Sequence, residues 1–154
     1  HPLMRALRPD KMTIAALAAT LTEYVAGRAT QMLPTWRMIA LSPEAIERRA
    51  AGIVSQLADS IHCSIIDGRS TIGGGALPEE TLPTRLLRID VPGMSAVSVA
   101  QELRRSTPPV IARIEHDAVV LDLRTVDPDA DRDVARTLQG LIDTHSTRSH
   151  EQSA

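Results

Sequence analysis

The first half of the chain repeats apolar residues at intervals of three and four, which is the period of an amphipathic helix. One such helix is predicted between Asp10, which can cap it, and Gly27, where it would end. Its apolar face comprises Ile14, Leu17, Ala18, Leu21 and Val25. A second helix is predicted from Ser42 and Pro43, an N-cap followed by a proline at the first helical position. Its apolar face comprises Ile46, Ala50, Ile53 and Leu57.

The segment between these two helices, residues 28–41, has no sustained apolar period. It contains Pro34, and the run at 36–39, which includes the single tryptophan, predicts a short extended piece. We therefore interpret the segment as a connector between two domains.

From Cys63 onward the pattern changes to short runs of β-prone residues. Residues 63–66 and 86–89 predict strands, and the glycine- and proline-rich stretch between them predicts a long loop. A third helix is predicted from Ser95. It must end before the proline pair at 108–109, because proline lacks an amide hydrogen and has a fixed backbone dihedral.

The end of the chain predicts a hairpin, a helix and a tail. The hairpin strands are residues 110–114 and 119–123, on either side of a turn at 115–118. The last helix is predicted to begin near Asp127, because acidic residues in a first turn favour the positive end of the helix dipole. The polar residues 146–154 predict a frayed tail. This order of elements predicts an α+β fold, a small antiparallel sheet with helices on one face.

Composition narrows the possible functions. The 154 residues contain no Phe, one Trp and one Tyr, which argues against an aromatic platform that stacks on RNA bases. A net charge of −2 gives the whole chain no basic footprint for nucleic acid or an anionic membrane. A single cysteine excludes an internal disulfide, and no apolar run is long enough to span a membrane, so we expect a cytoplasmic location.

Two arginine positions are candidates for anion binding. Arg5 and Arg8 are three residues apart, and if they share a helical turn their guanidinium groups converge on one anion. Phosphate is the anion that this arrangement favours. The alternative is two solvated arginines near a helix start. Arg113 alternates with apolar residues in a predicted strand and could bind a carboxylate, or it could instead pair with Asp122 across the hairpin.

Other candidate motifs are less specific. The Gly73–Gly75 run permits close backbone approach to a ligand, but it equally suits a tight turn and matches neither a Walker nor a dinucleotide fingerprint. Glu79 and Glu80 beside it are typical of a solvated surface. The five histidines are scattered, and none has the neighbouring partner that a general base needs.

Several blocks of sequence resemble one known family. They are residues 1–11 (His-Pro-Leu-x-Arg-Ala-Leu-Arg-x-Asp-Lys), 34–38 (Pro-Thr-Trp-Arg-Met), 73–78 with 81–84, 108–114 and 121–126. Together and in this order they resemble the carboxyl-terminal third of bacterial selenocysteine synthases, the L-seryl-tRNA(Sec) selenium transferases. The resemblance runs from residue 1 to about residue 141.

The resemblance implies a pyridoxal 5'-phosphate enzyme of the aspartate-aminotransferase-like fold type I, a homo-oligomer that converts seryl-tRNA(Sec) with selenophosphate. It places the family's two anion-binding arginines on Arg5 and Arg8. It also implies a division into residues 1–41, the end of the large domain and a connecting helix, residues 42–145, the small carboxyl-terminal domain, and the tail at 146–154.

The chain departs from the family pattern at the catalytic lysine. The family carries its Schiff-base lysine in a Ser-Gly-Asp-Lys segment upstream of the His-Pro-Leu block, and this chain contains no such segment. Lys11 belongs to the arginine motif instead. The chain begins without methionine, so we expect a piece of a longer protein, inactive alone. Two alternatives stay open: a related pyridoxal-phosphate lyase acting on small phosphorylated amino acids, and a non-catalytic α+β oligomerisation module.

Overall fold

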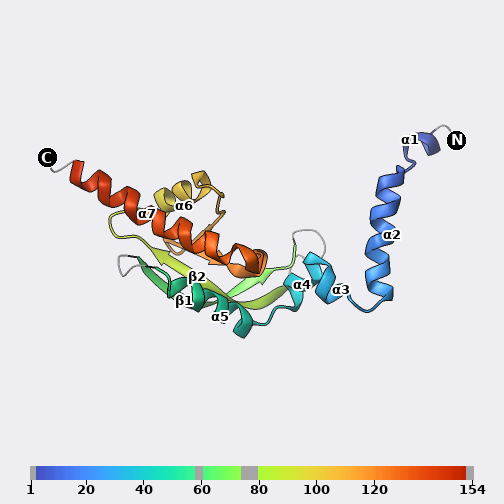
Figure 1. Cartoon of the computed structure of the whole chain (residues 1–154), viewed down its shortest axis with the longest axis horizontal. Helices are drawn as coiled ribbons and strands as arrows, with labels where there is room; N and C mark the ends of the chain where they lie inside the picture. The colour runs from blue at the N-terminus through green and yellow to red at the C-terminus, as the bar shows by residue number, and fades with distance from the viewer. Residues whose placement is uncertain (1–2, 58–60, 74–79, 152–154) are drawn as a thin grey trace. The chain divides into compact units, whose positions relative to one another are not determined.

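The computed structural model describes residues 3–57, 61–73 and 80–151 and divides the chain into two compact units, His1–Ala40 and Leu41–Ala154 (Figure 1). The first unit contains α1 (Leu3–Ala6), α2 (Lys11–Val25), α3 (Ala29–Met32) and α4 (Pro34–Ala40). The second contains α5 (Pro43–Val54), β1 (His62–Thr71), β2 (Thr81–Asp90), α6 (Ala96–Arg105), β3 (Arg113–Glu115), β4 (Ala118–Asp122) and α7 (Asp131–Glu151), with short 3-10 turns at Leu123–Thr125 and Pro128–Ala130. None of the helices in these described ranges has the length and apolarity of a membrane span.

The predicted first helix is α2, and Asp10 caps it by accepting a hydrogen bond from the Thr13 amide at 2.8 Å. This bond to the carboxylate lowers the pKa of Asp10. No residue of α2 is buried in the described structure, so its apolar side chains, including Leu17 and Leu21, lie exposed.

The extended piece predicted at 36–39 is wrong, because α3 and α4 make most of this segment helical. Pro34 is the first residue of α4, a position where its fixed φ and missing amide hydrogen favour a helix start. The helix brings Trp36 against Tyr24, whose hydroxyl accepts a hydrogen bond from the indole Nε1. The two rings meet edge to face, with centroids 6.3 Å apart.

The second unit contains an antiparallel sheet in the order β1-β2-β4-β3. β1 and β2 pair without interruption from His62 opposite Asp90 to Thr71 opposite Thr81, and are longer than the predicted strands. Residues 67–71 and 81–85 therefore belong to the sheet rather than to the predicted loop. Pro83 is accommodated within β2 at an exposed position.

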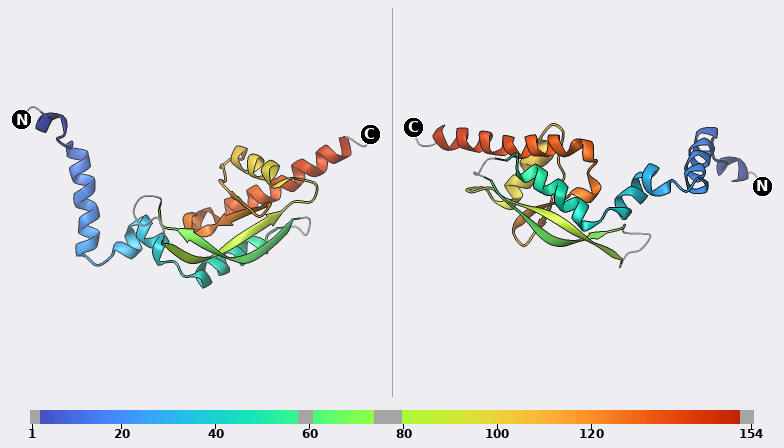
Figure 2. Two further views of the ribbon diagram at one scale, coloured as in Figure 1. Left: turned by 180° about the vertical axis from the view of Figure 1, so that it is seen from behind. Right: turned by 60° about the horizontal axis from the view of Figure 1, so that its bottom comes forward.

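Three helices, α5, α6 and α7, cover the same face of this sheet (Figure 2, right view). Alternate strand residues, such as Leu87 in β2 and Leu121 in β4, point into this face. They pack against helix residues that are fully buried, among them Ile46, Ile53, Leu103 and Leu138. The α+β class with a small antiparallel sheet is thus confirmed.

The predicted hairpin is present with a shorter first strand. β3 covers only Arg113–Glu115, and the turn consists of His116 and Asp117, which both adopt positive φ (49° and 57°). Two central residues with positive φ form the turn that matches the twist of a hairpin. The backbone of α7 is helical to Glu151, beyond residue 146, where the sequence predicts a frayed tail.

Candidate functional site

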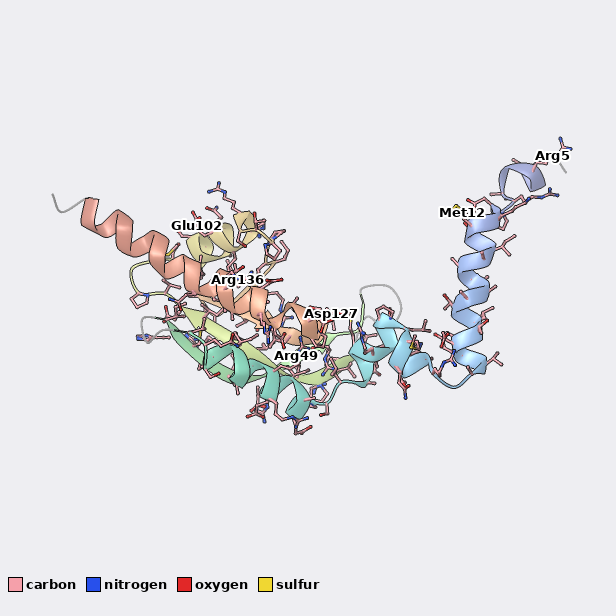
Figure 3. The ribbon with its side chains drawn as sticks, viewed as in Figure 1. Arg5, Met12, Arg49, Glu102, Asp127 and Arg136 are labelled. Carbon is pink, nitrogen blue, oxygen red and sulfur yellow. The ribbon has the colours of Figure 1, made fainter. Side chains whose placement is uncertain are left out.

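The arginine segment at the start of the chain lies in the first unit. Arg5 belongs to α1, whereas Arg8 follows that helix and precedes the cap of α2. The two arginines therefore do not share a helical turn, because α1 ends at Ala6. Both side chains are exposed, and Figure 3 shows Arg5 extending from α1.

Neither of these arginines has an internal counter-charge within the described structure. The nearest carboxylate in sequence, that of Asp10, accepts the Thr13 amide and is thereby occupied by the helix cap. In contrast, Arg28 in the same unit forms an ion pair with Glu23 at 2.9 Å. Arg5 and Arg8 are thus exposed and have no ion-pair partner among the residues that the structure describes, which leaves their guanidinium donors accessible from solvent.

Arg113 lies at the edge of the sheet in the second unit. It forms an ion pair with Glu115 at 3.3 Å, so the alternative pairing with Asp122 is wrong. The register explains this, because Arg113 faces Val120 rather than Asp122 in the β3–β4 hairpin. Arg113 lines a pocket of about 490 Å³ between the residues that precede β3, the end of β4 and the start of α7.

Asp122 has a different role, as part of a buried polar network on the sheet face opposite the helices. Its carboxylate accepts hydrogen bonds from the hydroxyls of Ser70 and Thr84, the latter at 3.1 Å, and from the backbone amide of Arg124 at 3.0 Å. These even-numbered strand residues share this face because side chains alternate along a strand.

Arg124 completes this network, and the sequence analysis missed it. Its guanidinium donates to the carbonyls of Leu41 and Pro83, each at 2.7 Å, and to the Ser70 hydroxyl at 3.2 Å. Only 4% of the residue is exposed. Burial lowers the pKa of Arg124, and the charge of Asp122 opposes this shift. The Leu-Asp-Leu-Arg alternation at 121–124 was the available signal, since it separates two charged residues from two apolar ones, and Arg124 itself lies in the 3-10 turn that follows β4.

A second arginine, Arg49 of α5, binds the segment between β4 and α7 through hydrogen bonds (Figure 3). It donates to the carbonyls of Leu123 at 2.8 Å and Val126 at 2.9 Å. It also makes two hydrogen bonds to the carboxylate of Asp131, at 2.7 and 2.9 Å. Arg49 and Arg124 therefore stabilise the scaffold rather than face a ligand.

A smaller pocket of about 270 Å³ lies between α6 and α7. Figure 3 shows Glu102 on α6 and Arg136 on α7, which both line it. Arg136 is paired with Asp133 at 2.8 Å, three residues earlier on its own helix. Glu102 is half-buried and pairs with Arg105 at 4.0 Å, so both charges already have partners, which is typical of a solvated groove.

The remaining candidates do not assemble into a site among the described residues. Of the glycine run only Gly73 is described; Gly74, Gly75 and Glu79 lie outside the described residues. Burial raises the pKa of the Cys63 thiol to about 11, so it is protonated and a poor nucleophile at neutral pH. No cluster of His, Cys, Asp or Glu in the described ranges could hold a metal ion.

Comparison with known proteins identifies the family. The family model described as L-seryl-tRNA selenium transferase matches residues 1–127. Similar relatives named L-seryl-tRNA(Sec) selenium transferase come from Geotalea daltonii (40% identical over 92% of this chain), Geobacter sulfurreducens (43% over 84%) and Solidesulfovibrio magneticus (44% over 90%). The chain spans 32%, 29% and 31% of the lengths of these relatives, respectively.

The match covers both units, from the arginine segment to the buried network around Arg124. Of the blocks that carry the resemblance, residues 1–11 include the exposed Arg5 and Arg8, and residues 121–126 include the buried Arg124. On this coverage and identity, the chain belongs to the L-seryl-tRNA selenium transferase family.

Proposed function

We propose that this chain forms part of an L-seryl-tRNA(Sec) selenium transferase, which converts seryl-tRNA(Sec) to selenocysteinyl-tRNA(Sec) with selenophosphate as the selenium donor. The observation that carries this proposal is the family match over residues 1–127, which includes the solvent-directed Arg5 and Arg8. The relatives' names do not favour a lyase of small phosphorylated amino acids or a non-catalytic module. The proposal includes a cytoplasmic homo-oligomer with the aspartate-aminotransferase-like fold type I.

Within that reaction, we assign Arg5 and Arg8 to the phosphate-like group of the donor. Each guanidinium offers several N–H groups, and charge-assisted bonds to phosphate oxygens are about twice as strong as neutral ones. Their separate positions, one in α1 and one after it, allow them to approach an anion from two directions.

Arg113 is assigned to substrate binding as a third residue. Its ion pair with Glu115 is partly exposed, so an anionic substrate group can compete with the Glu115 carboxylate at little cost. The adjoining pocket supplies apolar surface from Val110 and Ile111 for the remainder of the bound group.

Pyridoxal 5'-phosphate is the proposed cofactor, and it supplies an electron sink for chemistry at the carbon that bears the seryl amino group. The residues of this chain do not fit as its site. The only lysine, Lys11, is exposed on the first residue of α2, and it lines none of the pockets described above. We therefore assign cofactor binding to parts of the enzyme outside this chain.

The isolated chain is accordingly expected not to bind pyridoxal 5'-phosphate covalently. An exposed lysine with no enclosing pocket gives only weak, reversible reaction with the aldehyde. Absorption spectra recorded during a titration with the cofactor check this. A stoichiometric visible band that disappears in Lys11→Ala would show that the assignment is wrong.

Arg5→Ala or Arg8→Ala should weaken the use of selenophosphate by the whole enzyme by about ten- to a hundredfold, because each charge-assisted contact to the phosphate-like group contributes roughly 1.5–3 kcal/mol. Arg8→Lys should restore only part of this loss, since a point charge cannot reproduce the planar guanidinium. Arg113→Ala should cause a smaller loss of selenophosphate use, because Arg113 already pairs with Glu115. The assay is selenocysteinyl-tRNA formation against selenophosphate concentration, with binding of seryl-tRNA measured separately.

Arg28→Ala is the matched control, since Arg28 lies in the same unit but is paired with Glu23. It should leave the donor dependence unchanged. Normal donor dependence in Arg5→Ala and Arg8→Ala, or an equal loss of seryl-tRNA binding, would mean that these arginines are structural.

A further inference from the structure

The two edges of the sheet are built very differently. At one edge, β3 is only three residues long and follows the proline pair 108–109, which limits further pairing. At the other edge, β1 is ten residues long, and its register with β2 runs without a bulge from His62 to Thr71. β1 contains neither proline nor lysine, the residues that commonly protect an edge strand. Its outer row of backbone N–H and C=O groups is therefore suited to pairing with another strand (Figure 2).

The charges on β1 indicate which strand that is. Asp67 and Arg69 flank Gly68 and lie on the same face of the strand, because side chains alternate. The Asp67 side chain is 89% exposed, and Arg69 is exposed as well. Both are held in place from the β2 side, Asp67 by Arg85 and Arg69 by the Thr81 hydroxyl at 2.8 Å.

This arrangement is self-complementary in one register only. When two copies of β1 run antiparallel about a two-fold axis at Gly68, Asp67 of each copy lies opposite Arg69 of the other. An axis at Asp67 or at Arg69 would instead place two like charges opposite each other, which destabilises a strand pair. The charges thus select both the antiparallel direction and the register.

We propose that the β1 edge is a homodimer interface, in which residues 65–71 of two copies pair antiparallel and join two four-stranded sheets into one of eight strands. The contact is isologous, as expected for a two-fold dimer. It places Ile65 opposite Thr71, and Ile66 opposite Ser70, across the axis. The interface does not depend on the proposed transferase activity.

The test is a charge exchange measured by equilibrium sedimentation of the whole 154-residue chain over a range of concentrations. The unsubstituted chain should dimerise, to twice its mass of 16.7 kDa. Asp67→Arg and Arg69→Asp should each weaken the dimer by about tenfold, because each creates two like-charged pairs. The double variant restores opposite charges and should recover most of the affinity. Arg104→Asp, an exposed charge reversal on α6, is the control and should have no effect.

A second measurement separates this contact from association through the exposed apolar residues of α2. Amide exchange of β1 should slow with increasing concentration at alternate residues, those whose N–H groups face away from β2. A chain that stays monomeric would overturn the proposal. So would a dimer that both single variants leave unchanged, since it would form through another surface.

Discussion

Arg124→Met is expected to lower the free energy of unfolding of the second unit by about 3–5 kcal/mol, because several buried acceptors lose a charged donor at once. The substitution keeps an apolar stem but removes the donors to the carbonyls of Leu41 and Pro83. It also removes the positive charge that interacts electrostatically with the Asp122 carboxylate. Arg124→Lys should be nearly as harmful, because an ammonium group cannot reach both carbonyls and the Ser70 hydroxyl at once. Urea denaturation followed by far-ultraviolet circular dichroism measures the change.

Arg136→Met is the matched control for this experiment. Arg136 makes an exposed ion pair with Asp133 on its own helix, a type of contact that contributes about 0.3–0.5 kcal/mol. If the two methionine variants lose similar stability, the network around Arg124 does not support the fold in the way its geometry indicates.

Leu103→Ala should destabilise the same unit by about 2–5 kcal/mol. Leu103 is fully buried on α6, where it packs within the cluster between the helices and the sheet. Truncation removes apolar contacts and leaves a cavity that the close-packed neighbours cannot fill. The same denaturation experiment measures the loss.

Val97→Ala on the same helix provides the comparison. Val97 is 56% exposed, so its truncation should change stability by no more than about 0.5 kcal/mol. Equal effects at both positions would mean that α6 does not pack on the sheet as described.

Local signals were sufficient to predict the helices that carry strong start signals. Ser42 with Pro43, and Ser95, begin α5 and α6, and both serines accept a hydrogen bond from an amide three residues later. The same reasoning failed at residues 36–39, where β-prone residues outweighed the helix-start signal of Pro34. The interpretation as a connector gave Pro34 no helical role, whereas it is the first residue of α4.

The polar network lay beyond sequence reasoning for a geometric reason. Arg124 contacts residues that are 41 to 83 positions away along the chain, so only the folded sheet brings its acceptors together. Pairing of Arg113 with Asp122 was one of two predicted alternatives, but Arg113 lies opposite Val120, and Asp122 instead accepts hydrogen bonds from Ser70 and Thr84. For the arginine segment, the resemblance identified Arg5 and Arg8, but the helical turn that was to unite them ends at Ala6.

The contact between Trp36 and Tyr24 has a practical consequence for spectroscopy. These are the only aromatic residues of the chain, and both lie in the first unit. Intrinsic fluorescence and near-ultraviolet dichroism therefore report on α2 and α4 alone, and the second unit is optically silent in both. A melting curve recorded by fluorescence would miss the unfolding of the sheet, whereas a difference between the fluorescence and far-ultraviolet curves would give the stabilities of the two units separately.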